Sequence, residues 1–265
     1  MKPLSITLVQ PNLHWEDPVK NIKLFNKLLS PLKKGGTDLI VLPEMFSTGF
    51  SMKPAGLAEE MNGFSMQWMR ETAASLKSVI CGSLIIKEKK KYYNRFIWMQ
   101  PNGEYLHYDK RHLFRMGGED KVYTAGKKKI IIPYKGWNIC PFVCYDLRFP
   151  VWSRNKTTST GTLEYDLGLY VANWPAVRSF PWQQLLIARA IENQSYMVAV
   201  NRVGEDGTGM MHDGYSAILD MTGKPLLQIK PRKQTIATIQ LDKQPLIDFR
   251  KRFPAYKDAD QFKII

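Results

Sequence analysis

The stretch LSITLVQPNLHWEDPVKNIKLFNKLLSPLKKGGTDLIVLPE, residues 4–44, contains the pattern of a strand, a helix and a second strand. Residues 4–10 are mainly apolar and are followed by a proline, which predicts a strand. Asp-Pro at 17–18 is a helix start, and apolar residues then recur at helical spacing until Gly-Gly at 35–36. Residues 38–42 predict a buried strand that leads directly into Pro-Glu.

Strands and helices continue to alternate along the rest of the chain. We predict helices over residues 64–76 and 182–193, because apolar side chains recur there at helical spacing. We predict strands over residues 79–86, 94–100, 104–109, 139–144, 166–172, 196–201, 215–220 and 225–229. No linker divides the chain, so the pattern favours a single α/β domain over residues 1–265, with mixed sheets and outer helices.

Composition excludes several classes of protein. Hydrophobic residues make up 44% of the 265 residues, which supports a large core and excludes a disordered or fibrous chain. Three cysteines, Cys81, Cys140 and Cys144, are a poor disulfide framework and indicate a reducing compartment. No apolar run approaches the roughly 20 residues of a membrane span, and the N-terminus has no signal-peptide pattern. We therefore expect a soluble cytoplasmic protein that does not bind a membrane.

The formal net charge of +14 raises nucleic acid as a partner. The basic residues, however, form short clusters at predicted turns, and no zinc-finger spacing or RNA-binding motif accompanies them. We interpret the charge as a solvated surface or as an electrostatic funnel for a small anionic substrate, and we expect no nucleic-acid partner. The polar stretch 156–162 predicts a loop, and the apolar tail 253–265 predicts packing on the body or on a second subunit.

Three polar residues follow predicted buried strands, where α/β proteins place their sites: Glu44, Lys110 and Cys144. Taken singly, such residues are usually a helix cap, a surface charge and a core filler. Together they suffice for acyl transfer without a histidine or a metal. A carboxylate can take the thiol proton, the thiolate attacks a carbonyl, and the ammonium stabilises the resulting oxyanion with a backbone N–H.

The segments around these residues resemble the three signatures of the nitrilase superfamily of carbon-nitrogen hydrolases. They are VLPEMF at 41–46, YDKRHLF at 108–114 and VCYDLRFP at 143–150, with 66 and then 34 residues between Glu44, Lys110 and Cys144. The resemblance extends through VANWP at 171–175, ARAIENQ at 188–194 and VNRVG at 200–204. It implies a four-layer α-β-β-α sandwich that dimerises, with its C-terminal segments reaching across.

The resemblance also implies roles for particular residues. Glu44 corresponds to the general base, Lys110 to the oxyanion stabiliser and Cys144 to the nucleophile that forms a thioester. Glu119, nine residues after Lys110, matches a second glutamate that the family places beside the substrate and the lysine. No metal or cofactor is implied.

Within the superfamily, RFPVWSRN at 148–155 and LFRM at 113–116 resemble the bacterial omega-amidase branch, although Val151 replaces the glutamate of many relatives. This branch hydrolyses the terminal amide of 2-oxo dicarboxylic monoamides such as 2-oxoglutaramate and 2-oxosuccinamate. Motif position suggests four substrate-binding residues, and Arg148 is expected to form a salt bridge with Asp146. The four suggested residues are Phe114, Tyr145, Trp174 and Arg202.

Three alternatives remain open at this stage. The same motifs also suit an aliphatic amidase, an N-carbamoyl amino acid hydrolase or a nitrilase. A binding protein with a basic surface would leave the three residues without a role. A Cys–His protease would need a histidine beside Cys144, and the sequence offers His14, His107, His112 and His212. We expect His112, inside the Lys110 motif, to be structural.

Overall fold

The structure is a computed structural model that describes residues 2–264, and two six-stranded sheets form its centre. Along the first sheet the strands are β14 (Thr235–Leu241), β1 (Leu4–Gln10), β2 (Leu39–Val41), β3 (Val79–Glu88), β4 (Lys91–Met99) and β5 (Tyr105–Asp109). Along the second they are β13 (Pro225–Gln228), β12 (Ala217–Leu219), β9 (Tyr196–Val200), β8 (Leu167–Val171), β7 (Trp137–Val143) and β6 (Ile132–Tyr134). A separate hairpin pairs β10 (Val203–Glu205) with β11 (Met211–Asp213).

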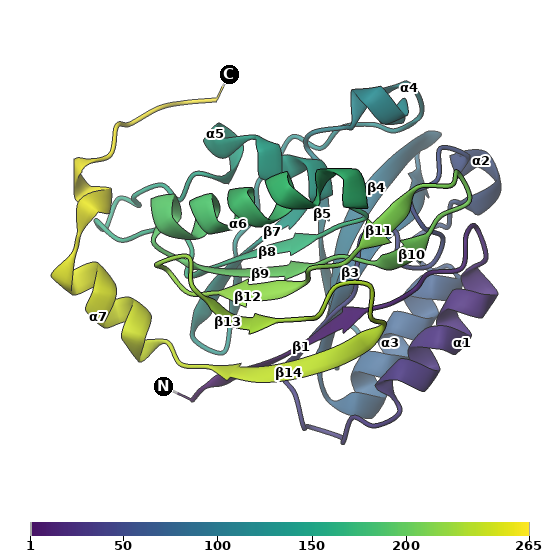
Figure 1. The fold of residues 1–265 in the computed structure, drawn as a ribbon, viewed down its shortest axis with the longest axis horizontal. Helices are drawn as coiled ribbons and strands as arrows, with labels where there is room; N and C mark the ends of the chain where they lie inside the picture. The colour runs from purple at the N-terminus through teal and green to yellow at the C-terminus, as the bar shows by residue number, and fades with distance from the viewer. Residues whose placement is uncertain (1, 265) are drawn as a thin grey trace.

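Helices cover the outer faces of the two sheets (Figure 1). The first sheet carries α1 (Pro18–Leu29) and α3 (Phe64–Leu76), and the second carries α6 (Ser179–Asn193). The predicted four-layer α-β-β-α sandwich is therefore confirmed. The shorter helices are α2 (Pro54–Leu57), α4 (Glu119–Val122), α5 (Pro150–Ser153) and α7 (Gln244–Arg252), with 3-10 turns η1 (Arg115–Gly117), η2 (Cys144–Arg148), η3 (Ala176–Arg178) and η4 (Ala255–Asp258).

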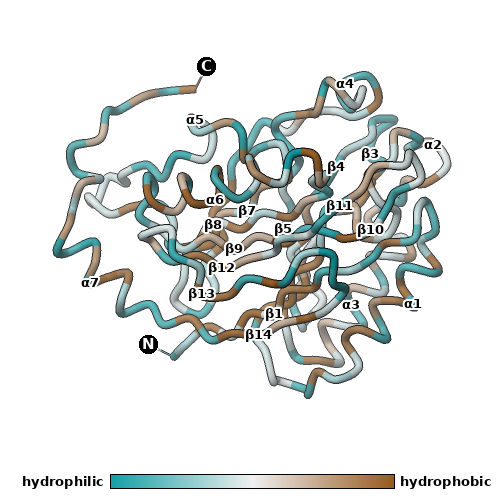
Figure 2. The backbone as a smooth tube through the Cα atoms, in the orientation of Figure 1, coloured by the Kyte–Doolittle hydropathy of each residue, from teal (hydrophilic) through white to brown (hydrophobic). Residues whose placement is uncertain are grey.

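The central strands are buried on both faces, which explains their nearly continuous apolar sequences. In β2, Leu39 and Val41 join the core between the sheets, whereas Ile40 packs toward α1 and α3. Figure 2 shows hydrophobic residues along the strands in the middle of the molecule. Strand β1 pairs with β2 in parallel, and β7 pairs with β8 in parallel. The carboxyl ends of the paired strands therefore lie at the same edge of each sheet, where polar residues follow them.

The structure differs from the sequence-based prediction in two respects: one helix ends earlier than expected, and one strand and one helix were not predicted. Helix α1 ends at Leu29 rather than at Gly35, because Pro31 has no N–H to continue the helical hydrogen bonds. Strand β14 and helix α7 were not predicted. Strand β14 is the outermost strand of its sheet and pairs with β1 over the whole length of β1. A partner more than 200 residues away in the sequence therefore stabilises this strand.

Residues 253–264 continue from α7 as a largely exposed tail (Figure 1), which contacts the rest of the protein at a few positions. The Gln194 side chain donates a hydrogen bond to the Phe253 carbonyl at 2.8 Å. The Lys156 ammonium donates to the Phe262 carbonyl at 3.1 Å and lies 4.2 Å from the centre of the Phe262 ring. The tail thus packs against the polar loop; Ile265, its last residue, lies outside the described residues. Of the helices within residues 2–264, none combines the length and apolar character of a membrane span.

Candidate active site

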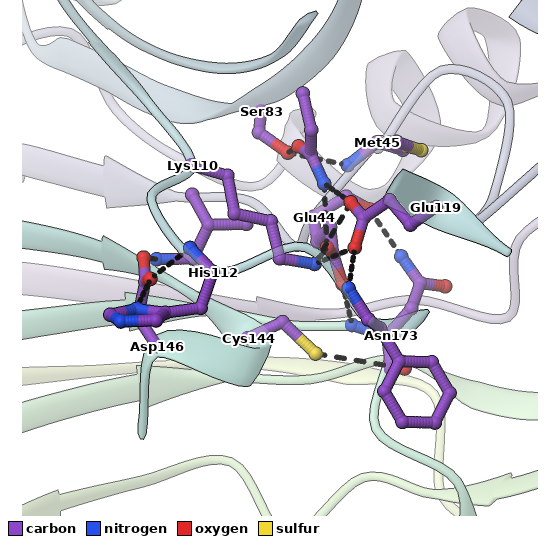
Figure 3. A network of polar contacts seen from close by, with 12 residues as sticks. Glu44, Met45, Ser83, Lys110, His112, Glu119, Cys144, Asp146 and Asn173 are labelled. Carbon is purple, nitrogen blue, oxygen red and sulfur yellow. Dashed lines mark hydrogen bonds and ion pairs between the residues drawn. The ribbon is translucent and has the colours of Figure 1, made fainter. Parts of the chain in front are cut away.

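Two glutamates enclose the Lys110 ammonium (Figure 3). Lys110 follows β5, and its Nζ donates to Glu44 Oε1 at 2.9 Å and to the two carboxylate oxygens of Glu119 at 3.0 and 2.9 Å. All three side chains are buried, at 1%, 0% and 0% exposure. Since burying an unpaired charge is costly, the three must be held as a set. The structure therefore joins the three residues that the sequence placed 66 and 9 positions apart.

Uncharged polar residues hold this set in position. Asn94 on β4 donates to Glu44 Oε1 at 2.7 Å and to Glu119 Oε1 at 3.1 Å. The side-chain oxygen Oδ1 of Asn94 accepts from the Ser83 hydroxyl at 2.7 Å, and that hydroxyl accepts from the Met45 N–H at 2.8 Å. Both side chains are fully buried. The sequence analysis missed them, although a polar residue inside an apolar strand was an available signal.

The second sheet reaches the same set through Asn173, which follows β8. Its backbone N–H donates to Glu44 Oε2 at 2.8 Å, and its side-chain amide donates to the Glu44 carbonyl oxygen. The Glu44 carboxylate is thus fixed by Lys110, Asn94 and Asn173 from different strands. This fixes its orientation relative to the second sheet, which carries Cys144.

Cys144 lies at the end of β7 and is the first residue of η2. Its φ of 44° is in the left-handed region, which is strained for a residue with a Cβ and gives the chain a sharp turn. The side chain is 9% exposed, and Sγ lies 4.0 Å from the Asn173 carbonyl oxygen (Figure 3). The next N–H, that of Tyr145, is in the first turn of η2, where N–H groups have no partner within the helix.

Burial and neighbouring charges perturb the ionisation of this site. Burial alone lowers the pKa of Lys110, but the Glu119 and Glu44 carboxylates outweigh it and raise that pKa above its ordinary value. Burial raises the pKa of Glu119, against the opposing effect of Lys110. Burial, followed by the Glu44 carboxylate, raises the pKa of the Cys144 thiol. The resting thiol therefore keeps its proton, and a carboxylate is beside it to accept that proton.

Asp146 fixes the turn that carries Cys144. Its buried carboxylate accepts from the Val143 N–H at 3.0 Å, from the Tyr108 hydroxyl at 2.7 Å and from the His112 N–H at 3.0 Å. The His112 ring contacts it at 2.8 Å and stacks on Phe149 with ring centres 3.8 Å apart. His112 is structural, as predicted.

The expected salt bridge between Arg148 and Asp146 was wrong. The Asp146 oxygens are already occupied by the donors from β5, β7 and the Lys110 loop. The Arg148 guanidinium instead lies over the Trp174 ring, 4.9 Å from its centre.

A cavity of about 350 Å³ opens onto Lys110 and Cys144. Three of the four predicted substrate-binding residues line it, together with Arg148 and Arg178, which the sequence analysis did not propose for substrate binding. The predicted residues in the lining are Phe114, Tyr145 and Trp174.

Arg202, the fourth, is not among the residues that line the cavity. It is fully buried, and its guanidinium donates to the carbonyls of Val203, Leu13 and Glu205 at 3.1, 3.3 and 2.9 Å. Burial lowers its pKa to about 10, against the opposing effect of the Asp206 carboxylate. Arg202 therefore crosslinks backbone segments in this structure, and the cations of the cavity wall come from elsewhere.

Among the hydrogen bonds formed within residues 2–264, none joins a histidine to Cys144, whose Sγ lies against the Asn173 carbonyl oxygen. His212 lines the cavity, but its ring nitrogens face the Met210 carbonyl at 3.1 Å and Asp206 at 4.0 Å. Burial, and then the positive charge of Arg202, lowers the pKa of His212 to about 4. The arrangement gives no support to a Cys–His pair. Within residues 2–264, no three His, Cys, Asp or Glu side chains are grouped to hold a metal ion.

Comparison with known proteins agrees with this geometry. The family model of carbon-nitrogen hydrolases matches residues 5–251. The chain is 44% identical to a Yersinia enterocolitica protein named omega-amidase YafV, with 100% of both chains covered. It is 30% identical to the 2-oxoglutaramate amidase of Bacillus subtilis, with 96% of each covered. The crystal structure of XC1258 from Xanthomonas campestris, a CN-hydrolase superfamily protein with an arsenic adduct in its active site, matches with a TM-score of 0.97 and 43% identity over 100% of both chains. The chain therefore belongs to the carbon-nitrogen hydrolase family.

Proposed function

We propose that this protein is a cysteine-dependent amidase. It hydrolyses the terminal amide of 2-oxo dicarboxylic monoamides, 2-oxoglutaramate and 2-oxosuccinamate, to the 2-oxo acid and ammonia. The observation that carries the proposal is that Cys144 and Lys110 line one cavity, while the buried carboxylates of Glu44 and Glu119 accept hydrogen bonds from the Lys110 ammonium. The names of the relatives from Yersinia enterocolitica and Bacillus subtilis support the choice of substrate.

The first half of the proposed reaction forms a thioester. Glu44 accepts the thiol proton as Cys144 Sγ attacks the amide carbon, since the raised pKa of the thiol keeps it protonated beforehand. The amide oxygen becomes an oxyanion, which the Lys110 ammonium and the Tyr145 N–H stabilise. Glu44 then returns the proton to the nitrogen, the C–N bond breaks, and ammonia leaves.

The second half hydrolyses the thioester. Glu44 takes a proton from water, and the resulting hydroxide attacks the thioester carbon at the same oxyanion site. The C–S bond breaks, the 2-oxo acid is released, and Glu44 returns the proton to Cys144 Sγ. One carboxylate therefore serves as base and acid twice, which requires the fixed orientation that Asn94 and Asn173 give it.

Glu119 has a supporting role in this proposal. Its two carboxylate oxygens accept hydrogen bonds from the Lys110 ammonium, and its Oε2 also accepts from the Phe114 N–H at 2.6 Å. It therefore keeps the ammonium charged and aimed, and ties the Phe114 loop to the reaction centre.

Ammonia release from 2-oxoglutaramate tests the proposal. We expect wild-type protein to turn over this substrate and Cys144→Ala to show only the background rate. The same assay compares 2-oxoglutaramate with four other substrates: 2-oxosuccinamate, a simple aliphatic amide, an N-carbamoyl amino acid and a nitrile. A clear preference for any of the last three in kcat/KM would reject the 2-oxo amide assignment while keeping the cysteine chemistry.

We also propose that the protein is a cytoplasmic homodimer with a small-molecule substrate and neither a nucleic-acid nor a membrane partner. Apolar side chains at the surface near α5 and α6 support the dimer: Val151, Val177 and Phe180 are 56%, 75% and 73% exposed. Such residues are costly to leave in water and are typical of protein interfaces. The three free cysteines support the reducing compartment.

A further inference from the structure

Two arginines in the cavity wall have no carboxylate partner among residues 2–264. The Arg148 guanidinium lies 4.9 Å from the centre of the Trp174 ring, and that of Arg178 lies 5.3 Å from the centre of the Phe114 ring. Among the ion pairs formed within residues 2–264, none involves either arginine. Each guanidinium therefore rests on an aromatic face, an arrangement that leaves its edge available for hydrogen bonds.

The two positive charges are close enough to affect each other. Burial, and then the charge of Arg148, lowers the pKa of Arg178. Like charges brought together in a partly desolvated wall repel, and a bound anion would remove that repulsion. The other charged residues that line the cavity do not supply this anion.

Besides the two arginines, the charged residues of the lining are Lys110 and Asp206, and both are already engaged. Lys110 is paired with its two glutamates. Asp206 Oδ1 accepts from the Thr208 N–H at 2.8 Å, the Thr208 hydroxyl at 2.6 Å and the Met210 N–H at 3.1 Å. The other oxygen, Oδ2, lies 4.0 Å from His212 Nε2. The arginine pair is thus the uncompensated positive charge of this cavity.

We propose that Arg148 and Arg178 form a carboxylate subsite that selects amides with a negatively charged far end. The inference rests on the proposed function, because it assigns the arginines to the substrate's carboxylate while its amide carbon faces Cys144. Arginine presents paired N–H groups that match a carboxylate, and such charge-assisted hydrogen bonds are the stronger kind. A cavity of about 350 Å³ lies at the small end of ligand sites, as a short dicarboxylic monoamide requires.

The first experiment compares a charged with a neutral amide. The substrates are 2-oxoglutaramate and pentanamide, which has the same chain length but lacks both the carboxylate and the 2-oxo group. We expect Arg148→Met and Arg178→Met each to lower kcat/KM for 2-oxoglutaramate about 10- to 100-fold, mainly through KM. Their kcat/KM for pentanamide should stay within about threefold of wild type, which also shows that the variants are folded. Equal losses on both substrates would overturn the proposal.

Arg115→Met is the matched control. Its side chain lies on η1 at 86% exposure and is not part of the cavity lining. The substitution removes the same charge near the cavity, so it reports long-range attraction alone. We expect kcat/KM for 2-oxoglutaramate to change by less than about twofold. A loss as large as that of the other two variants would contradict a subsite.

A binding measurement separates this inference from the proposed function. Calorimetric titration with glutarate, a dicarboxylate that cannot be hydrolysed, should show binding to wild type and at least tenfold weaker binding to Arg178→Met, about 1.4 kcal/mol. Glutarate binding through the two arginines without ammonia release from 2-oxoglutaramate would keep the subsite and reject the proposed function. Turnover of 2-oxoglutaramate with glutarate affinity unchanged in both variants would keep the function and reject the subsite.

Discussion

At the scale of single residues, the Lys110 ammonium contacts the buried carboxyl groups of both Glu44 and Glu119, each at 2.9 Å. Removing one carboxylate changes the charge balance around the ammonium without changing the shape of the site. Glu119→Gln tests this. Because Lys110 would lose a partner and its orientation, we expect kcat to fall about 100-fold, with a smaller change in KM. Steady-state kinetics and near-UV circular dichroism check the result; unchanged kcat would remove Glu119 from the proposed machinery.

His212 links protonation to stability. In the folded protein its pKa is about 4 instead of 6.5, because burial and Arg202 outweigh the nearby Asp206. Between these values the unfolded chain binds a proton that the folded protein does not, so the free energy of unfolding falls as the pH drops from 6.5 to 4. The shift corresponds to about 3 kcal/mol. Urea unfolding at pH 7 and pH 4.5 should show a smaller loss in His212→Gln than in wild type; equal losses would contradict the assignment.

Glu44, Lys110 and Cys144 could be predicted from the sequence, because each follows an apolar strand and lies within a recognisable motif. Glu119 was visible only through the resemblance. Asn94 and Ser83 were missed: their polarity within apolar strands was a signal, but their hydrogen-bond partners depend on how the strands pair, which the sequence does not show. The partners of Arg148 were misjudged for the same reason: Asp146 is near in sequence, but Tyr108 and His112 arrive from a distant strand end and occupy it.

At the scale of elements, the loop after β5 passes very close to Gly126. A Cβ added there would meet the Asp109 carbonyl oxygen at 1.9 Å, and the Gly126 N–H donates to the Lys110 carbonyl at 2.8 Å. Gly126→Ala must therefore displace backbone beside Lys110. We expect the free energy of unfolding to drop by about 2–4 kcal/mol and activity to fall at least tenfold. Urea unfolding and ammonia release measure both.

Gly56→Ala is the control for this substitution. Gly56 lies in α2, and a Cβ there would have no atom within 4 Å. We expect activity to be unchanged and stability to be equal or about 0.5–1 kcal/mol higher, because alanine favours the helix. A Gly126→Ala variant that behaves like this control would show that the loop after β5 tolerates displacement.

Elements were predictable where local pattern and burial agree. Helix α3 has the predicted bounds, Phe64–Leu76, and β1 likewise spans residues 4–10. Strand β14 was missed because much of it is only half-buried, so its sequence lacks the apolar run of the inner strands. Its pairing with β1 joins residues 235–241 to residues 4–10, and no local sequence pattern predicts a pairing between such distant segments.

At the scale of the whole molecule, the apolar surface near η3 and α6 bears on assembly. Phe180 is 73% exposed and Val177 75% exposed. If this surface is the proposed dimer interface, a charge at its centre will oppose association. We expect light scattering to give a dimer for wild type at micromolar concentration and a monomer for Phe180→Asp. A wild-type monomer would contradict the proposal.

The net charge of +14 is a property of the whole molecule that the sequence left open between a solvated surface and an electrostatic funnel. Two of these positive charges, Arg148 and Arg178, line the cavity, and neither pairs with a carboxylate in the part of the chain that the structure describes. Their placement supports the attraction of a small anion, and it could not be read from the sequence because both arginines are positioned by aromatic rings from other segments.

The proposed chemistry depends on a covalent bond to Cys144, and rapid-quench intact-protein mass spectrometry can observe it. Wild-type protein mixed with 2-oxoglutaramate and quenched in acid within milliseconds should gain one adduct, with the mass of the substrate less ammonia. Peptide mapping of the quenched sample should place this adduct on the peptide that contains Cys144. The adduct should be absent in Cys144→Ala and should decay as 2-oxoglutarate appears. Ammonia release at the full rate with no adduct at any time, or full activity in Cys144→Ala, would contradict the account.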